Sequence, residues 1–253
     1  MLLDSHIHVG QYHEYYFSPK DVHKLMEECG VDYYAVSSTT ICEENYERAV
    51  HEIEELVSLD SRRVLPVMWI TPEGLKGNIA WYLESDIHWK CIKIHPFLHK
   101  GVWESSDSRM IEVVEIAKEL DVPLLIHTGY DKCCNSGKYE PIIKHYPEVD
   151  FILAHGRPAK ESVRLMNQYD NVYVDSAFMD IEELIYIINN GRDDHFLWGT
   201  DMCIPKYFHP QINIPCYYTE KLSAFRKICS EEQYRRVTYM NATKVFNVNN
   251  IIT

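Results

Sequence analysis

The chain has 253 residues, 46% of them hydrophobic and 25% charged, with a formal net charge of −13 and a pI near 5.4. This length suits one domain over residues 1–253 with a large core, and the acidic balance argues against nucleic acid or an anionic membrane as partner. No signal-peptide pattern and no apolar run long enough to cross a bilayer occur, so we expect no membrane partner and a cytoplasmic location. The eight cysteines show no Cys-x-x-Cys spacing, so we expect reduced thiols.

The first ten residues predict a strand that carries two histidines on one face. Leu3, Ile7 and Val9 supply an apolar, strand-favouring frame. Residues two apart on a strand point the same way, so His6 and His8 share a face. Two neighbouring imidazoles can provide half of a divalent metal site, although His-x-His also occurs by chance.

Helical and strand patterns alternate along the rest of the chain. Ser18-Pro19 predicts the start of a helix and Gly30 its end. Further strands are predicted at 33–36, 64–70, 91–95, 123–127, 151–155, 172–175 and 196–201. Further helices are predicted over 43–58, through Leu75, Ile79 and Leu83, from Met110 to Leu120, around Ile142 and Tyr146, through Val163 and Met166, from Leu184 to Ile188, near 219–228, and after the capping-box sequence Ser230-Glu231-Glu232-Gln233.

This alternation predicts the α/β class. Most of the strands are continuous apolar runs, which is typical of a parallel sheet covered on both faces. Eight strand–helix units in about 250 residues match a single-domain (β/α)8 TIM barrel. A doubly wound open sheet is the competing topology, but no Gly-rich phosphate turn follows the first strand.

Ionisable residues stand where the predicted strands end. They are His6, His8, His95, His127, His155, Asp175 and Asp201. In a barrel the carboxyl ends of the strands form one rim, so we expect these side chains to converge on a single cavity. Chance could place one or two histidines at strand ends, but five of them with a terminal aspartate are hard to obtain by accident.

Five motifs together resemble the amidohydrolase superfamily of metal-dependent barrel enzymes. They are Asp4-x-His6-x-His8, Ile126-His127-Thr128-Gly129, Ala154-His155-Gly156, Gly199-Thr200-Asp201 and, near the end of the chain, Asn241-Ala242-Thr243-Lys244-Val245-Phe246. The closest similarity is to the amidohydrolase-2 branch, which includes hydrolases and metal-dependent decarboxylases. The resemblance covers nearly the whole chain and implies fold and metal more than substrate.

The resemblance implies that His6, His8, His127 and Asp201 bind one divalent ion. Three nitrogens and one carboxylate suit Zn²⁺, with Mn²⁺ or Fe²⁺ as alternatives. Asp201 would accept a proton from the water that the metal activates and pass it to the leaving group. His155 would be either a ligand of a second metal or a catalytic imidazole.

The Lys93-Ile94-His95-Pro96 sequence bears on whether one or two ions bind. It resembles the arrangement in the cyclic-amide hydrolases of the superfamily, in which a carboxylated lysine bridges two metals. The alternatives are a buried Lys93 paired with an acidic residue, or one that binds a substrate carboxylate. Because many members of the branch use one ion, we favour one, and Lys93, His95 and His155 stay candidates for a second metal or for substrate.

Other candidates lie near the predicted rim. Arg157 could bind a substrate carboxylate, or it could cap the helix after Pro158. Asp175 could hold a ligand imidazole in place, or bond nearby amides. Two aromatic groups could line a pocket or only pack the loops together: Tyr12, His13, Tyr15 and Tyr16 in the first, and Tyr207, Phe208, His209, Tyr217 and Tyr218 in the second.

The sequence therefore predicts a metal-dependent hydrolase that attacks an amide, ester or lactone-type bond of a small molecule with metal-activated water. The first alternative is a metal-dependent non-oxidative decarboxylase of an unsaturated or aromatic carboxylic acid, which Arg157 would favour. The second is a barrel that binds a metal or ligand without catalysis. The resemblance adds a homodimer as an expectation.

Overall fold

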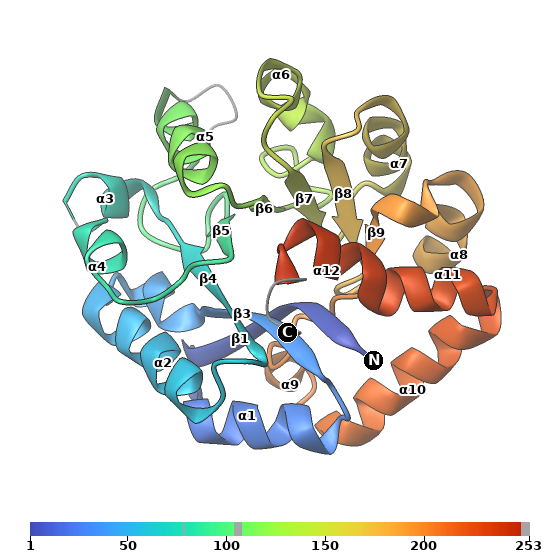
Figure 1. Ribbon diagram of the computed structural model, residues 1–253, viewed down its shortest axis with the longest axis horizontal. Helices are drawn as coiled ribbons and strands as arrows, with labels where there is room; N and C mark the ends of the chain where they lie inside the picture. Colours follow the sequence, from blue (N-terminus) through green and yellow to red (C-terminus); the bar gives the residue numbers. More distant parts are fainter. Residues whose placement is uncertain (78, 104–107, 249–253) are drawn as a thin grey trace.

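The strands form one curved sheet with helices around it (Figure 1). The computed structural model describes residues 1–77, 79–103 and 108–248. In sheet order the strands within these ranges are β2 (Tyr15–Phe17), β1 (Leu3–Tyr12), β3 (Tyr33–Ser38), β4 (Val64–Trp69), β5 (Cys91–Ile94), β6 (Leu124–His127), β7 (Phe151–Ala154), β8 (Val172–Asp175) and β9 (Phe196–Leu197). All neighbouring pairs are parallel except β1 and β2, which form a hairpin.

Helices follow most strands and cover the outside of the sheet (Figure 1). The α-helices are α1 (Pro19–Glu28), α2 (Tyr46–Leu59), α3 (Pro72–Leu75), α4 (Ala80–Leu83), α5 (Ser108–Leu120), α6 (Glu140–His145), α7 (Ala159–Gln168), α8 (Ile181–Asn190), α9 (Pro205–Phe208), α10 (Ile214–Ile228), α11 (Glu231–Arg235) and α12 (Asn241–Val245). The 3-10 helices η1 (Thr39–Glu43), η2 (Ser136–Tyr139) and η3 (Asp193–His195) and the π-helix η4 (Arg236–Met240) complete the set.

The sheet closes because β1 bonds the segment that follows β9. The Ser5 N–H donates to the carbonyl of Trp198 at 2.8 Å, and the Asp201 N–H donates to the carbonyl of His6 at 2.7 Å. A parallel bridge joins Ile7 to the same segment. The predicted (β/α)8 TIM barrel is therefore confirmed, with the β1–β2 hairpin as an addition.

The Asp4 side chain reinforces this closure. Its Oδ2 accepts from the Thr200 hydroxyl at 2.6 Å, and its Oδ1 accepts from the Thr200 and His6 amides, each at 3.1 Å. Asp4 is fully buried, so each of these donors would lose its partner if the carboxyl group were removed.

The interior of the barrel is apolar at the end that the C-terminal helix covers. The cluster there contains Leu3, Ala35, Leu65, Val67, Cys91, Leu125, Ile152, Ala154, Tyr173 and Leu197 from the strands, and Tyr239, Ala242, Val245, Phe246 and Val248 from η4, α12 and the residues after them. In Figure 1, α12 lies across the centre of the ring of strands. This end of the barrel is filled, so a site can form only at the opposite end.

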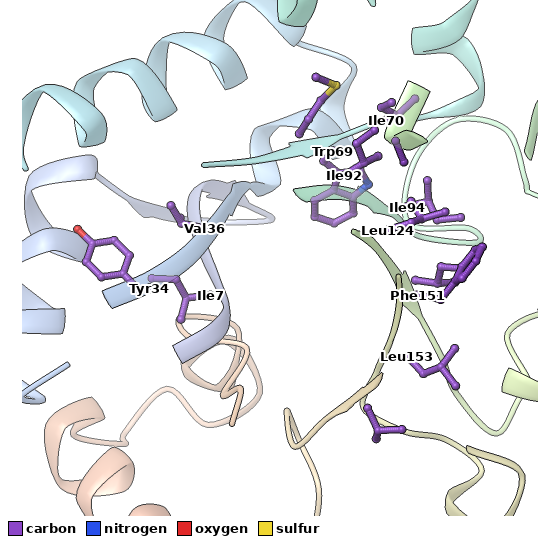
Figure 2. Close-up of a cluster of buried hydrophobic side chains, with 14 of the residues drawn as sticks. Ile7, Tyr34, Val36, Trp69, Ile70, Ile92, Ile94, Leu124, Phe151 and Leu153 are labelled. Carbon is purple, nitrogen blue, oxygen red and sulfur yellow. The ribbon is translucent and has the colours of Figure 1, made fainter. Parts of the chain in front are cut away.

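A second apolar cluster lies between the strands and the surrounding helices. Figure 2 shows part of it, with Ile7 from β1, Val36 from β3, Ile94 from β5, Leu124 from β6 and Leu153 from β7. On β3 and on β5 to β9 the apolar residues alternate between the two clusters, as the two-residue period requires, whereas β1 shifts its register between Asp4 and Ile7. Burial on both faces explains the continuous apolar runs.

Several predicted boundaries were wrong. The strand expected at 196–201 ends at Leu197, because the next residues bend to bond β1 and Asp201 takes a left-handed backbone with φ of 59°. The helix expected at 43–58 begins at Tyr46, where the Asn45 side chain accepts from the Arg48 amide at 3.2 Å. The expected helix through Leu75, Ile79 and Leu83 is two short helices, α3 and α4.

Other local predictions are confirmed. α1 begins at Pro19, with the Ser18 hydroxyl accepting from the Asp21 amide. α11 begins with the predicted capping box between Ser230 and Gln233. Among the described residues, no helix combines the length and apolar character that crossing a membrane requires.

Gly10→Ala should destabilise the barrel much more than Gly30→Ala. Both glycines have a left-handed backbone, with φ of 94° and 70°. A Cβ at Gly10 would lie 2.5 Å from Thr40 Oγ1 and 2.8 Å from Ser38 Oγ, whereas a Cβ at Gly30 meets nothing within 4 Å. We expect Gly30→Ala to cost about 1 kcal/mol of unfolding free energy and Gly10→Ala about 3 kcal/mol. Urea unfolding measures both, and equal losses would contradict this account.

Candidate metal centre and active site

The inward-facing rows of the strands change from apolar to polar along their length. On β4 the row runs Leu65, Val67 and Trp69. On β5 and the residue after it, Cys91 belongs to the inner apolar cluster and is followed on the same face by Lys93 and His95. The polar ends of such rows meet at the open end of the barrel, as the sequence predicted.

These ends line a cavity of about 500 Å³. Most of the residues predicted for the site are on its wall: His8, Lys93, His95, His127, His155, Arg157 and Asp201. His6 does not line the cavity but contacts this group, since its Nε2 lies 2.7 Å from the Nζ of Lys93. The structure therefore brings every predicted site residue to one place.

His6, His8 and Asp201 make the tightest cluster. Asp201 Oδ1 lies 3.2 Å from His6 Nε2 and 2.8 Å from His8 Nε2. One ligand atom from each of the three side chains lies within 4.8 Å of the other two, and all three residues are buried. This group could hold a metal ion. His127 is beside it in the cavity but is not one of its three members.

The partners of His6 and His8 direct their Nε2 atoms toward this cluster. His6 Nδ1 donates to Asp175 Oδ2 at 2.9 Å, which is the contact expected for Asp175. His8 Nδ1 lies 3.0 Å from the Ser37 hydroxyl and 3.3 Å from the Ser37 carbonyl, which can only accept, so this nitrogen carries the proton. A neutral imidazole that donates through Nδ1 carries its lone pair on Nε2, so both rings present a ligand atom.

Lys93 places a cation against those lone pairs. Its Nζ donates to His6 Nε2 at 2.7 Å and to His8 Nε2 at 3.0 Å, and it lies 4.5 Å from the centre of the Trp69 ring. Burial lowers the pKa of Lys93 to about 8, although Asp201 and Asp175 oppose this shift. The cluster thus already attracts a positive group of the chain itself.

His127 and His155 are joined in a directed hydrogen-bond chain. His155 Nδ1 lies 3.0 Å from the carbonyl of Ala177, which can only accept, so this nitrogen carries the proton. His155 Nε2 therefore accepts from His127 Nδ1, at 3.0 Å. In this arrangement His127 Nε2 has a free lone pair, and both nitrogens of His155 are engaged by the chain.

Burial keeps the rings of this group neutral. It lowers the pKa of His8 to about 3, with the Lys93 charge adding to the effect, and that of His155 to about 4. It also lowers the pKa of His127 well below the usual range. For Asp201 burial acts in the opposite direction, but His6 and His8 outweigh it and hold the carboxyl pKa below its usual range. The His8, His127 and His155 rings are therefore neutral beside an ionised Asp201.

Arg157 is largely engaged by the protein. Its Nε and Nη2 donate to the two carboxylate oxygens of Glu183, each at 3.1 Å, and Nη2 also donates to the carbonyl of Phe178 at 2.6 Å. Tyr130 donates to the same carboxylate. Arg157 lines the cavity, but only its Nη1 is left for a substrate by these contacts.

The predicted aromatic wall is present in part. Tyr12, Phe208 and His209 line the cavity. Tyr207 packs against Tyr12 and His13 with ring centres 5.1 Å and 4.7 Å apart. The first aromatic group and the segment after β9 thus meet across the cavity mouth, which serves both functions that the sequence left open.

Sequence reasoning missed two features of this wall. Trp69 lies within the predicted strand 64–70 and ends the observed strand β4, and the alternation from Leu65 and Val67 would have pointed it inward. Glu183, which neutralises Arg157, gave no such signal, because it lies on the first turn of α8.

His155 and Asp201 share an unusual backbone. Both adopt positive φ values, 66° and 59°, which are uncommon for residues other than glycine. Such conformations persist where the surrounding structure imposes them, and they concentrate at functional sites. Here the His155 amide donates to Asp175 at 2.9 Å and the Asp201 amide donates to His6.

The fold is shared with solved enzyme structures at low sequence identity. A 4-oxalomesaconate hydratase from Rhodopseudomonas palustris superposes with a TM-score of 0.71, 14% identity and coverage of 100% of this chain and 97% of that one. A 2,6-dihydroxybenzoate decarboxylase from Rhizobium superposes with a TM-score of 0.68 and 14% identity, over 98% of this chain and 99% of that one. A 5-carboxyvanillate decarboxylase from Novosphingobium aromaticivorans contains bound manganese. It superposes with a TM-score of 0.71 and 11% identity, over 98% of this chain and 97% of that one.

Sequence comparison adds a curated relative and a family. A dihydroorotase from Helicobacter hepaticus is 30% identical over 155 residues, which cover 56% of this chain and 44% of that protein. The alignment thus spans less than half of the relative's length. The amidohydrolase family model matches residues 4–248, which include every residue of the site described above. The chain therefore belongs to the amidohydrolase family.

Proposed function

We propose that this protein is a metal-dependent hydrolase that cleaves an amide, ester or lactone-type bond of a small molecule. His6, His8, His127 and Asp201 would hold one divalent ion, with Zn²⁺ preferred for this donor set and Mn²⁺ or Fe²⁺ as alternatives. The observation that carries the proposal is the convergence of His6 Nε2, His8 Nε2 and Asp201 Oδ1. Membership of the amidohydrolase family supports it.

The donor chemistry of these residues fits a divalent ion. The His6 and His8 rings are held through Nδ1, so both Nε2 atoms lie beside the Asp201 carboxylate. Partners of this kind around ligand imidazoles are typical of metal sites. The hydrogen bonds that Lys93 makes to the same two nitrogens support lone pairs on both of them.

The ion would act as a Lewis acid and would lower the pKa of water toward neutrality. Asp201, ionised and beside the ligand nitrogens, is placed to take the proton of the attacking water and deliver it to the leaving nitrogen or oxygen. His155 donates through Nδ1 to Ala177 and accepts from His127, which fixes the orientation of His127. The aromatic residues at the cavity mouth would help to exclude bulk water.

Decarboxylation is the second candidate. Arg157 lines the cavity and keeps Nη1 for a substrate carboxylate, and several proteins with this fold are decarboxylases. The bidentate Glu183 contact neutralises most of the Arg157 charge, so we favour hydrolysis. Products formed in ¹⁸O-labelled water separate the two reactions: hydrolysis incorporates one ¹⁸O atom, whereas decarboxylation releases CO₂ without incorporation.

Asp201→Asn should reduce both metal content and turnover. The amide keeps the size of the side chain but loses the charge and the ability to accept a proton, so kcat should fall at least about a hundredfold. Metal content is measured by inductively coupled plasma mass spectrometry and kcat on ester, lactone and amide panels. Asp170→Asn, at an exposed carboxylate paired with Arg192, is the matched control and should change neither. Unchanged metal content in Asp201→Asn would reject Asp201 as a ligand.

Lys93→Met tests whether one or two ions bind. A single ion at His6 and His8 competes with the Lys93 ammonium, so removing that charge should retain one equivalent and tighten its binding. Titration of the chelator-treated protein with Zn²⁺ measures stoichiometry and affinity, with Lys24→Met at an exposed lysine as control. Two equivalents in the wild type that fall to one or none in Lys93→Met would establish a bridging lysine and overturn the single-ion proposal.

The metal-free protein should lose stability as the pH falls from about 6.5 to about 4. Burial lowers the pKa of His155 to about 4 and that of His8 to about 3, from 6.5. In this window the unfolded rings take up protons that the folded rings refuse, so each removes about 1.4 kcal/mol of unfolding free energy per pH unit. Burial raises the pKa of Asp4 to about 7, so in this window folded Asp4 holds a proton that the unfolded carboxyl lacks and gains stability as the pH falls. This gain involves one proton, whereas the loss from His155 and His8 involves two.

Urea unfolding between pH 7.5 and 4.5 in the presence of a chelator measures this slope. His155→Gln should reduce it by about one proton. His51→Gln, at an exposed ring on α2, should leave it unchanged. A stability profile that is flat or rises toward acid would show that these rings are not held neutral.

A further inference from the structure

His95 lies on the cavity wall with one ring nitrogen committed to the chain. Its Nδ1 accepts from the amides of Phe97 and Leu98, at 3.3 Å and 3.0 Å. A nitrogen that accepts amide hydrogens carries a lone pair, so the proton of the neutral ring is on Nε2. No hydrogen bond joins this Nε2 to any residue in the described ranges.

The ring is held in this neutral form. His95 is only 6% exposed, and two amide hydrogens on Nδ1 leave no place there for a ring proton. Its ring lies between Trp69, at 6.1 Å, and His127, at 3.8 Å between ring centres. To bind a metal through Nε2, the ring would have to move its proton to Nδ1 and lose both amide bonds. His95 is therefore built as a hydrogen-bond donor.

Trp69 packs beside His95 on the same wall. It is 2% exposed, it lines the cavity, and its ring is inclined by 26° to that of His95. Its Nε1 is buried and has no hydrogen-bond partner in the part of the chain that the structure describes, and the same is true of Trp103 Nε1. Because the indole nitrogen of Trp69 is itself buried, the donor that this wall offers to a bound molecule is His95 Nε2–H.

We propose that His95 is a substrate-positioning residue whose Nε2–H binds an sp² oxygen of the substrate, a carbonyl or carboxylate oxygen. The Trp69 ring packs against the ring of His95 on the same wall. The assignment rests on the proposed use of this cavity as the active site, and it removes His95 from the candidates for a second metal. The rest of the substrate faces aromatic walls that include Tyr12, Phe178 and Phe208.

Two substitutions separate this role from a structural one. His95→Asn keeps an acceptor, Oδ1, where Nδ1 bonds the Phe97 and Leu98 amides, but it has no group at the position of Nε2. His95→Gln keeps a donor near the position of Nε2 and loses the acceptor. A structural role would be rescued by Asn, and a substrate-binding role by Gln.

The probes are benzoate, benzamide and benzylamine, which share a ring and differ in the group attached to it. NMR titration of the metal-loaded protein measures their dissociation constants. We expect His95→Asn to weaken benzamide binding about tenfold and benzoate binding at least as much. His95→Gln should recover most of this loss. Benzylamine has no acceptor oxygen and should bind the wild type and both variants equally.

A spectroscopic measurement on the wild-type protein does not depend on whether a variant folds. In protein with ¹⁵N-labelled histidine, His95 should show a protonated Nε2 and an unprotonated Nδ1, and its Nε2 proton should shift downfield when benzoate or benzamide is added. His95→Asn supplies the assignment by loss of the signal. A protonated Nδ1, or probes that leave the signal unmoved, would overturn the proposal.

Metal content distinguishes this inference from the proposed function. His95→Asn should keep the wild-type content, and loss of an equivalent would show that His95 is a ligand. Should the wild type bind no divalent ion at all, the hydrolase proposal fails. The probe titrations in chelator still test the donor role of His95, and equal affinities for wild type and His95→Asn would reject it.

Discussion

The backbone pairing between β1 and the segment after β9 is the constraint on which the site depends. It joins residues almost 200 positions apart and brings Asp201 against His6 and His8. The same amide that helps to close the barrel, that of Asp201, bonds the carbonyl of His6. Closure of the fold and assembly of the candidate metal centre are therefore one event. A slip of one residue in this pairing would turn the two histidines outward.

Burial then determines what the assembled groups can do. The cavity gathers imidazoles that would repel one another if charged, and desolvation keeps them neutral. Asp175 remains ionised, because His6 and His155 outweigh the effect of burial on its pKa, and it fixes His6 through Nδ1. Carbonyl acceptors on Ser37 and Ala177 fix the protons of His8 and His155. Several buried polar groups of the chain therefore serve to orient the imidazole nitrogens.

Much of the fold and of the candidate site could be predicted from the sequence, because the sequence patterns either recur with a regular period or stand at the ends of strands. Apolar runs identified the parallel strands, and histidines at their ends identified the rim. The end of β9 was hard to predict, because Trp198 and Thr200 favour a strand whereas Gly199 and Asp201 do not, and the backbone after Leu197 bends to meet β1. The tautomers of the histidine rings could not be predicted either, because each depends on single carbonyl or amide groups in loops. The amides of Phe97 and Leu98 beside His95 are an example. Pairing of Arg157 with Glu183 depends on how α8 packs, which no local pattern encodes.

The two sides of the cavity differ in polarity, and this difference gives a substrate a direction. On the side of β1 and Asp201 the groups are lone pairs and a carboxylate, which favour cations and electron-poor atoms. On the side of β4 and β5, His95 offers an Nε2–H donor, which favours oxygen, next to the ring of Trp69. A bound molecule with an oxygen on one edge and a reacting carbon on the other would be aligned by both walls before any chemistry occurs. Lys93 lies between them, against Trp69 and against the nitrogens of His6 and His8, so its charge is the link through which one wall can influence the other.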